Sequence, residues 1–138
     1  FGKDGKIAWV YRHFPLEQIH SHALLAANGA ECANKLGGVQ AFWSFTDTVF
    51  ARQSEGLSEA LFSEVAQGIG IDQDAFASCM TSKTYDAMIT ASTQNAIAAG
   101  GQGTPYSIII SADGTRQAVN GAVPYATLKS QIQKVLGQ

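Results

Sequence analysis

The spacing of apolar residues changes from one stretch of the chain to the next, and each spacing predicts a different element. Residues 7–14 (IAWVYRHF) are dense in β-branched and aromatic side chains and stop at Pro15, which predicts a largely buried strand. Alanine and leucine dominate from about Ser21 to Leu36, which predicts a helix that Gly37 ends.

Helical spacing continues through the middle of the chain. Phe42, Phe45 and Val49 recur on one face of a second helix. Ser58 and Asp72 are placed to cap the start of a third and a fourth helix. The side chains expected inside these two helices are Leu61, Phe62, Val65, Phe76 and Cys79.

Strand spacing returns after a fifth helix, which is expected over about residues 84–99. Residues 106–110 and 115–119 are predicted to form two strands joined by a turn at 112–114, and a last helix begins near Pro124. This order favours an α/β fold with a helical insertion over a helical bundle, because the two β regions need each other as partners.

The composition is that of a single globular domain covering residues 1–138. Hydrophobic residues make up 46% and the mean hydropathy is +0.01, which excludes a disordered or low-complexity chain. The net charge of −2 argues against binding to nucleic acids or to acidic lipid surfaces, since both need a basic face. No apolar run approaches the ~20 residues of a membrane-spanning helix.

Several segments resemble, in their order and spacing, the DsbA-like branch of the thioredoxin superfamily. They are VYRHFPL, AECA, FWSFTDTVF, FASC, GTPYSIII and NGAVPYATLKSQI, and together they span nearly the whole chain. The resemblance implies a thioredoxin-like fold with a helical insertion over about 21–99. It also implies a thiol–disulfide oxidoreductase that forms or isomerises disulfides in client proteins outside the cytoplasm. It implies no cofactor, a periplasmic, secreted or membrane-anchored bacterial protein, and two kinds of partner: cysteine-containing clients and a membrane reoxidase.

The sequence departs from this family at the reactive centre. Family members carry a Cys-x-x-Cys at the start of the first helix, whereas the two cysteines here, Cys32 and Cys79, lie in no such motif. We therefore expect an N-terminally truncated chain that lacks the first strand and the Cys-x-x-Cys helix and is inactive as given. In the thioredoxin arrangement that the resemblance implies, the missing strand lies between 7–14 and 106–110, so we expect exposed sheet edges and a strand-exchanged or edge-paired homo-oligomer.

Thr104 and Pro105 are the candidate substrate-binding residues. In the resembled family the proline at this place is cis and faces the reactive cysteines, where the neighbouring backbone pairs with an extended client. The Thr104 hydroxyl is suited to donate a hydrogen bond to sulfur. The alternative interpretation is an ordinary proline that opens a strand after the glycine-rich turn 100–103.

Cys32 and Cys79 lie on two predicted helices of the insertion. Some members of the resembled family join cysteines at matching places, so the resemblance implies a structural disulfide. Unpaired buried thiols and a second redox pair are the alternatives. A bridge that closes this loop of about 48 residues stabilises a fold by about 4 kcal/mol in the chain-entropy model.

The histidines raise the question of a metal site. His20 and His22 are close in sequence and Glu17 is a further candidate ligand, but no third or fourth ligand has a useful spacing, and no metal site is predicted. We expect His13, His20 and His22 to be solvent-facing or near a helix cap. For Trp43 two interpretations stay open: a place in the helix core, or a place in an exposed groove that binds clients.

Three functions are compatible with these residues. The first, which we favour, is the main body of a DsbA-like oxidoreductase in which Thr104 and Pro105 hold the client while a thiolate outside these residues performs the exchange. The second is a redox-inactive thioredoxin-fold module that binds peptides or a partner protein through the same loop. The third is a glutathione-handling or isomerase relative of the same fold.

Overall fold

The computed structural model describes residues 1–137, which form two compact units divided between Thr93 and Gln94. The first unit holds α1 (Ala23–Ala51), the short 3-10 helix η1 (Gln53–Glu55), α2 (Glu59–Gly68), α3 (Gln73–Ser82) and the start of α4 (Asp86–Ala98). The second unit holds the end of α4, the strands β1 (Tyr106–Ile110) and β2 (Arg116–Asn120), and α5 (Tyr125–Val135). Helices and strands therefore occur together, as the predicted α/β class requires.

Helix α1 is interrupted where the sequence predicts the end of the first helix. Gly38 has φ 77° and ψ −173°, a conformation that glycine adopts readily and other residues do not. The break therefore comes one residue after the predicted end at Gly37. The predicted second helix is the later part of α1, and its face of Phe42, Phe45 and Val49 is buried, as predicted.

Side-chain caps begin α2 and α3 at the predicted residues. The Ser58 Oγ accepts a hydrogen bond from the Leu61 N–H at 3.2 Å, and the Asp72 Oδ1 accepts one from the Ala75 N–H at 2.9 Å. Each cap satisfies a backbone donor that the first helical turn leaves without a partner. The side chains that these two helices bury are Leu61, Phe62, Val65, Ala66, Phe76 and Cys79.

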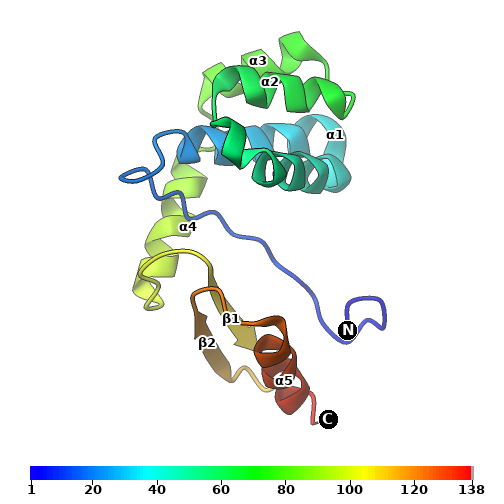
Figure 1. Cartoon of the computed structure of the whole chain (residues 1–138), viewed down its shortest axis with the longest axis vertical. Helices are drawn as coiled ribbons and strands as arrows, with labels where there is room; N and C mark the ends of the chain where they lie inside the picture. The colour runs from blue at the N-terminus through cyan, green and yellow to red at the C-terminus, as the bar shows by residue number, and fades with distance from the viewer. Residues whose placement is uncertain (138) are drawn as a thin grey trace. The chain divides into compact units, whose positions relative to one another are not determined.

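The core of the first unit lies between α1, α2 and α3, which pack against one another (Figure 1). Phe45 is fully buried, and its ring centroid lies 6.2 Å from that of Phe62 and 5.8 Å from that of Phe76. Gly29 lies against the same ring, since a Cβ added there would come 2.6 Å from the Phe45 Cζ. Rings from three helices thus fill the centre, and a glycine makes room for one of them.

The opening segment 7–14 differs from the prediction of a largely buried strand. It forms no β ladder with any residue of the described chain, and Trp9 is 63% exposed. Tyr11 and His13 pack edge-on against Phe42 instead. Aromatic and β-branched residues form a strand only where a neighbour accepts their backbone hydrogen bonds. The prediction of a sheet that joins this segment to the hairpin is therefore wrong. Within residues 1–137, the sheet contains only the two strands of the hairpin, β1 and β2.

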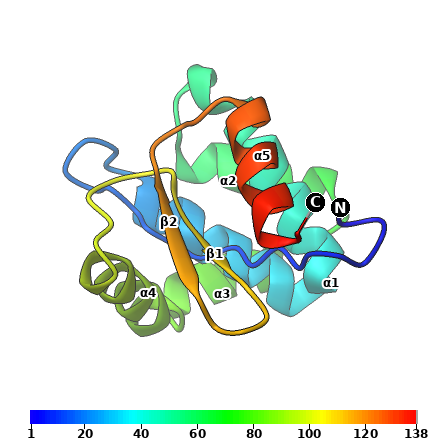
Figure 2. The same ribbon diagram turned by 90° about the horizontal axis from the view of Figure 1, so that it is seen from below.

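The second unit contains the predicted hairpin. β1 pairs antiparallel with β2 in a register that sets Tyr106 opposite Asn120, and the strands lie side by side in both views (Figures 1 and 2). In the turn, Asp113 accepts hydrogen bonds from the Ser111 hydroxyl and the Thr115 N–H, which lower the pKa of its carboxyl. The second strand begins and ends one residue later than predicted.

Replacing Gly29 with alanine is expected to lower the free energy of unfolding by about 1–3 kcal/mol, because the new methyl group would overlap the buried Phe45 ring. Urea unfolding followed by circular dichroism measures the change. Gly68→Ala is the matched control, since Gly68 also lies in a helix and nothing lies within 4 Å of its added Cβ. The control should be at least as stable as the wild type, and equal stability of the two variants would contradict the packing at Phe45.

Candidate functional site

The turn that leads from α4 into β1 is fixed at both ends. At the end of α4, the Gly101 N–H donates to the Ala96 carbonyl at 2.9 Å, and Gly100 has the positive φ of 93° that this Schellman arrangement needs. At the start of β1, the Tyr106 hydroxyl donates to the Ala99 carbonyl. The Tyr106 ring lies so close to Gly101 that a Cβ there would come 2.9 Å from a ring carbon.

Thr104 and Pro105 form the corner between this turn and β1. The peptide bond between them is cis, and both residues are exposed. The Pro105 carbonyl accepts a hydrogen bond from the Gly121 N–H at 2.9 Å, which ties the corner to the residue after β2. The two predicted substrate-binding residues therefore lie together at the surface, beside the end of β2.

A pocket of about 410 Å³ opens at this corner. Its lining comes from the glycine-rich turn, the corner and the end of β2, and consists of Gly100, Gln102, Gly103, Thr104, Pro105, Asn120 and Gly121. None of these side chains is ionisable. The polar side chains are the Thr104 hydroxyl and the carboxamides of Gln102 and Asn120, which suit hydrogen bonding to an uncharged polar ligand.

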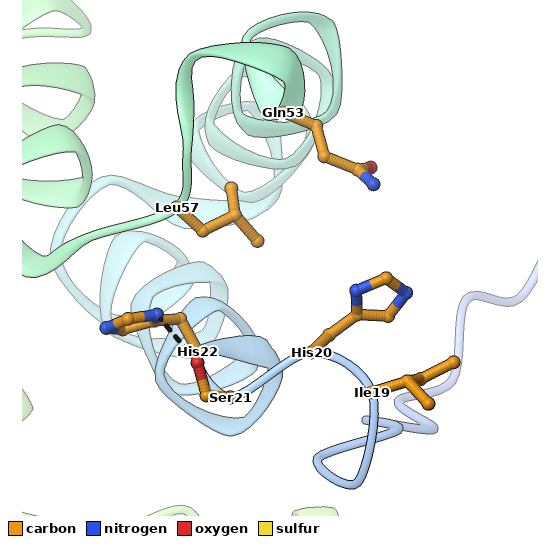
Figure 3. Close-up of a pocket in the computed structure, with 6 residues that line it drawn as sticks. All are labelled: Ile19, His20, Ser21, His22, Gln53 and Leu57. Carbon is orange, nitrogen blue, oxygen red and sulfur yellow. Dashed lines mark hydrogen bonds between the residues drawn. The ribbon is translucent and has the colours of Figure 1, made fainter.

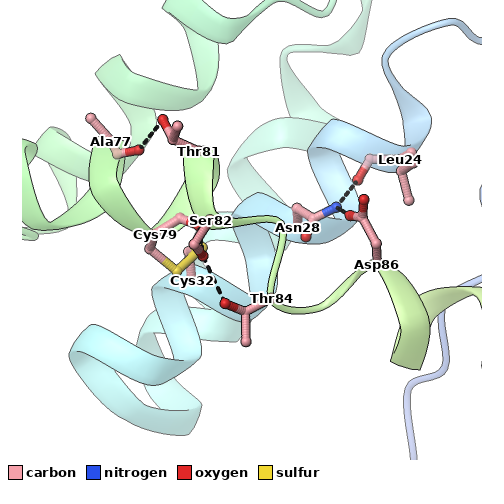
Figure 4. The surroundings of a disulfide bond; sticks show 9 residues. All are labelled: Leu24, Asn28, Cys32, Ala77, Cys79, Thr81, Ser82, Thr84 and Asp86. Carbon is pink, nitrogen blue, oxygen red and sulfur yellow. Dashed lines mark hydrogen bonds between the residues drawn. A yellow bond between two sulfur atoms is a disulfide. The ribbon is translucent and has the colours of Figure 1, made fainter.

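Cys32 on α1 and Cys79 on α3 are joined by a disulfide (Figure 4). Their Cα atoms are 5.9 Å apart, and both residues are buried. One turn earlier on α1, the Asn28 side-chain amide donates to the Asp86 Oδ1 at 2.8 Å and links α1 to the start of α4. The bridge therefore crosslinks helices inside the first unit, and it uses both cysteines of the chain.

His13 is buried, which corrects the prediction of a solvent-facing or capping residue. It is 6% exposed, and its Nε2 lies 2.8 Å from the Oε1 of Glu31 on α1. The carboxylate gives the imidazole a polar partner, so the ring can lie among aromatic side chains. Tyr11 packs edge-on against His13, Phe42 and Trp43, and burial raises the pKa of its hydroxyl. Trp43 is half-buried in this cluster.

His20 and His22 line a second pocket, of about 250 Å³, at the start of α1 (Figure 3). The two rings point in different directions, and the His22 Nδ1 lies 3.2 Å from the Ser21 hydroxyl, with which it shares a hydrogen bond. His22 precedes the first residue of α1 and His20 is exposed, as expected for these two. In residues 1–137 no three His, Cys, Asp or Glu side chains are grouped so as to hold a metal ion. The remaining lining residues are Ile19, Gln53 and Leu57.

A family model described as thioredoxin matches residues 2–134. The chain belongs to the thioredoxin family. The match includes the corner at Thr104–Pro105 and both cysteines, and it confirms the thioredoxin-like fold predicted from the sequence.

The chain is also similar to parts of three proteins named Na(+)/H(+) antiporter NhaA. It is 37% identical over 70 residues to NhaA 3 of Salinispora tropica, 32% over 99 residues to NhaA 1 of Salinispora arenicola, and 38% over 74 residues to NhaA 1 of Mycolicibacterium gilvum. These stretches cover 51%, 72% and 53% of this chain, but only 10%, 15% and 11% of the relatives. No solved structure matches the chain significantly. Within residues 1–137, every helix is too short or too polar to cross a lipid bilayer.

Sequence reasoning missed three residues of the candidate site: Gln102 and Asn120, which line the pocket, and Tyr106, which packs against the glycine-rich turn. Asn120 stands before a glycine, a pair typical of turns, but only the strand register places it opposite Tyr106 and beside the Thr104–Pro105 corner. Gln102 belongs to a turn that the sequence marks only by its glycines. No local signal shows that the two carboxamides line one pocket.

Replacing both Cys32 and Cys79 with alanine is expected to lower the free energy of unfolding by about 4 kcal/mol, because the bridge constrains a long loop of the unfolded chain. Urea unfolding of the oxidised wild type and the double variant measures the difference. Mass spectrometry after alkylation without reductant checks the bridge itself. The native protein should take up no alkyl group, and uptake of two would refute the disulfide.

Replacing His13 with alanine is expected to lower the free energy of unfolding by about 1–3 kcal/mol, because Glu31 loses its partner while it stays largely buried. His13→Gln keeps a hydrogen-bond donor and should recover part of this loss. His20→Ala is the control, since His20 is exposed, and it should stay within about 0.5 kcal/mol of the wild type. If urea unfolding finds His13→Ala as stable as this control, the buried pair is not a source of stability.

Proposed function

We propose that this chain forms the client-binding body of a DsbA-like thiol–disulfide oxidoreductase that acts on extracytoplasmic proteins. The observation that supports the proposal is the uncharged pocket at Thr104 and Pro105 in a chain of the thioredoxin family. In this proposal the two residues bind an extended segment of the client next to the disulfide that is exchanged. In this proposal the reactive pair is not among these residues, since Cys32 and Cys79 form a buried disulfide between two helices and neither lies in a Cys-x-x-Cys motif.

The reaction itself is thiol–disulfide exchange. A thiolate attacks one sulfur of a disulfide, a mixed disulfide forms, and the other sulfur leaves as a thiolate; a second thiolate then resolves the mixed disulfide. Residues of this chain contribute by binding the client. A client segment held at Thr104 and Pro105 keeps its cysteine in place, so that the attack becomes effectively unimolecular.

A second candidate is a redox-inactive thioredoxin-fold module that binds peptides or a partner protein through the same pocket. The Cys32–Cys79 bridge favours it, because the bridge is buried in the first unit and leaves the chain no thiol for exchange. Such a module would need the pocket but no reactive cysteine. The two candidates therefore agree on where a client binds and differ on whether thiol–disulfide exchange takes place once it is bound.

We also propose a location outside the cytoplasm, supported by the disulfide, since such bonds persist in oxidising compartments. The partners in this proposal are cysteine-containing clients and a membrane reoxidase. A homo-oligomer paired through strand edges stays a proposal, supported by the 62% exposure of Ile110 on β1. Antiport is not extended to this chain from the names of the NhaA relatives, because the matched stretches are at most 15% of their length.

Binding of an unfolded client tests the pocket. Thr104→Arg places a long charged side chain in it and is expected to weaken binding of reduced, carboxamidomethylated insulin B chain about tenfold or more, measured by calorimetry. Thr115→Arg is the matched control, because it adds the same side chain at an exposed position in the hairpin turn. The control should bind like the wild type. Unchanged binding by Thr104→Arg would overturn both candidates.

Redox activity separates the two candidates. Residues 1–138 by themselves are expected to be inactive in insulin reduction under either candidate, because their one disulfide is buried and they contain no Cys-x-x-Cys motif. The full gene product should reduce insulin if it is an oxidoreductase, and Thr104→Arg should lower that activity. A full product that binds the B chain but reduces no insulin selects the binding module.

A further inference from the structure

Two carboxamides from different loops line the pocket at Thr104–Pro105. Gln102 comes from the glycine-rich turn and Asn120 from the end of β2, and both residues are exposed. Neither side chain hydrogen-bonds another group within residues 1–137. Their donors and acceptors are therefore available to a molecule that enters the pocket.

A carboxamide carries the same pair of groups as a peptide bond, an N–H donor and a carbonyl acceptor. Two of them on a pocket wall are complementary to the main chain of an extended peptide, whatever side chains that peptide carries. A pocket built to read charge would need a carboxylate, a guanidinium or an ammonium group, and none lines this one.

The charged side chains of the hairpin lie at its other end. Tyr106 and Asn120 form the last pair of the register beside the pocket, whereas Ile110 pairs with Arg116 next to the turn that holds Asp113. With four residue steps between these pairs, the distance is about 14 Å, which exceeds the Debye length of about 8 Å at physiological salt. Their charges are therefore largely screened at the pocket.

The backbone beneath the two carboxamides is held by hydrogen bonds. Gly121, which follows Asn120, donates to the Pro105 carbonyl, and the Tyr106 hydroxyl donates to the Ala99 carbonyl in the turn that carries Gln102. The residues next to the two carboxamides are held in this way, since Gly101, which precedes Gln102, also donates to the Ala96 carbonyl. Holding the neighbouring backbone lowers the entropy lost when a ligand binds to these two side chains.

We propose that Gln102 and Asn120 are client-binding residues, whose carboxamides hydrogen-bond the main chain of an extended client segment without selecting for the charge of its side chains. The inference rests on the proposed function, since it names the class of client that the same pocket takes. It predicts clients chosen by extended, accessible backbone, with acidic and basic flanking sequences accepted alike.

Calorimetry with three cysteine-free peptides of equal length tests the inference. One peptide has uncharged flanks, one has lysine flanks and one has glutamate flanks. The wild type should bind all three with Kd values within about threefold of one another. Asn120→Asp, which keeps the shape and adds a charge, should favour the lysine peptide over the glutamate peptide by about fivefold or more.

The second measurement removes the proposed hydrogen bonds between the two carboxamides and the peptide. Asn120→Leu and Gln102→Met keep the size of each side chain, and each should weaken binding of all three peptides by about two- to tenfold. Gln67→Met is the control, because Gln67 is exposed on α2. Methylating the central backbone nitrogens of the uncharged peptide should weaken its binding to the wild type. The same methylation should not change the affinity of this peptide for the Asn120→Leu/Gln102→Met double variant, which lacks both carboxamides.

The outcomes separate this inference from the proposed function. If Thr104→Arg weakens binding while the Asn120 and Gln102 variants bind like the wild type, the inference is overturned and the proposed function stands. A wild type that separates the lysine and glutamate peptides by more than about tenfold also overturns the inference. If Thr104→Arg leaves peptide binding unchanged, the proposed function itself fails.

Discussion

The hydrogen bond from the Gly121 N–H to the Pro105 carbonyl holds the candidate site together. It continues the ladder of β1 and β2 by one rung, and at that rung only one hydrogen bond can form, because proline has no N–H to return. Without it, the corner before β1 and the end of β2 would be separate loops. The place of Asn120 beside Thr104 and Pro105 in the pocket, and with it the proposed binding of a client, depends on this contact.

Features fixed by residues close in sequence could be predicted. Ser58 and Asp72 each cap a helix through a backbone N–H three residues on, and Pro124 stands just before α5. The predicted helix end at Gly37 lies one residue before the break in α1 at Gly38. The apolar face of Phe42 and Phe45 was found because helical spacing alone decides which side chains face inward.

Features that depend on distant residues could not be predicted. The segment 7–14 has the composition of a strand, but composition supplies no hydrogen-bonding neighbour. The burial of His13 follows from Glu31, eighteen positions away on another element, and no spacing rule connects them. The same holds for the candidate site. Thr104 and Pro105 are predicted from the family resemblance, whereas Asn120 is placed beside them only by the strand register.

Stability and recognition are assigned to different kinds of residue in this chain. The first unit draws on an aromatic core and a disulfide, which uses both cysteines. The hairpin of the second unit would be only marginally stable by itself, and its pocket is kept in shape mainly by backbone hydrogen bonds and by glycines at the end of α4. Because the backbone carries the architecture there, the side chains of Gln102, Thr104 and Asn120 are left to contact a client. No cysteine lines this pocket, so the proposed binding is compatible with an oxidoreductase and with a redox-inactive binding module.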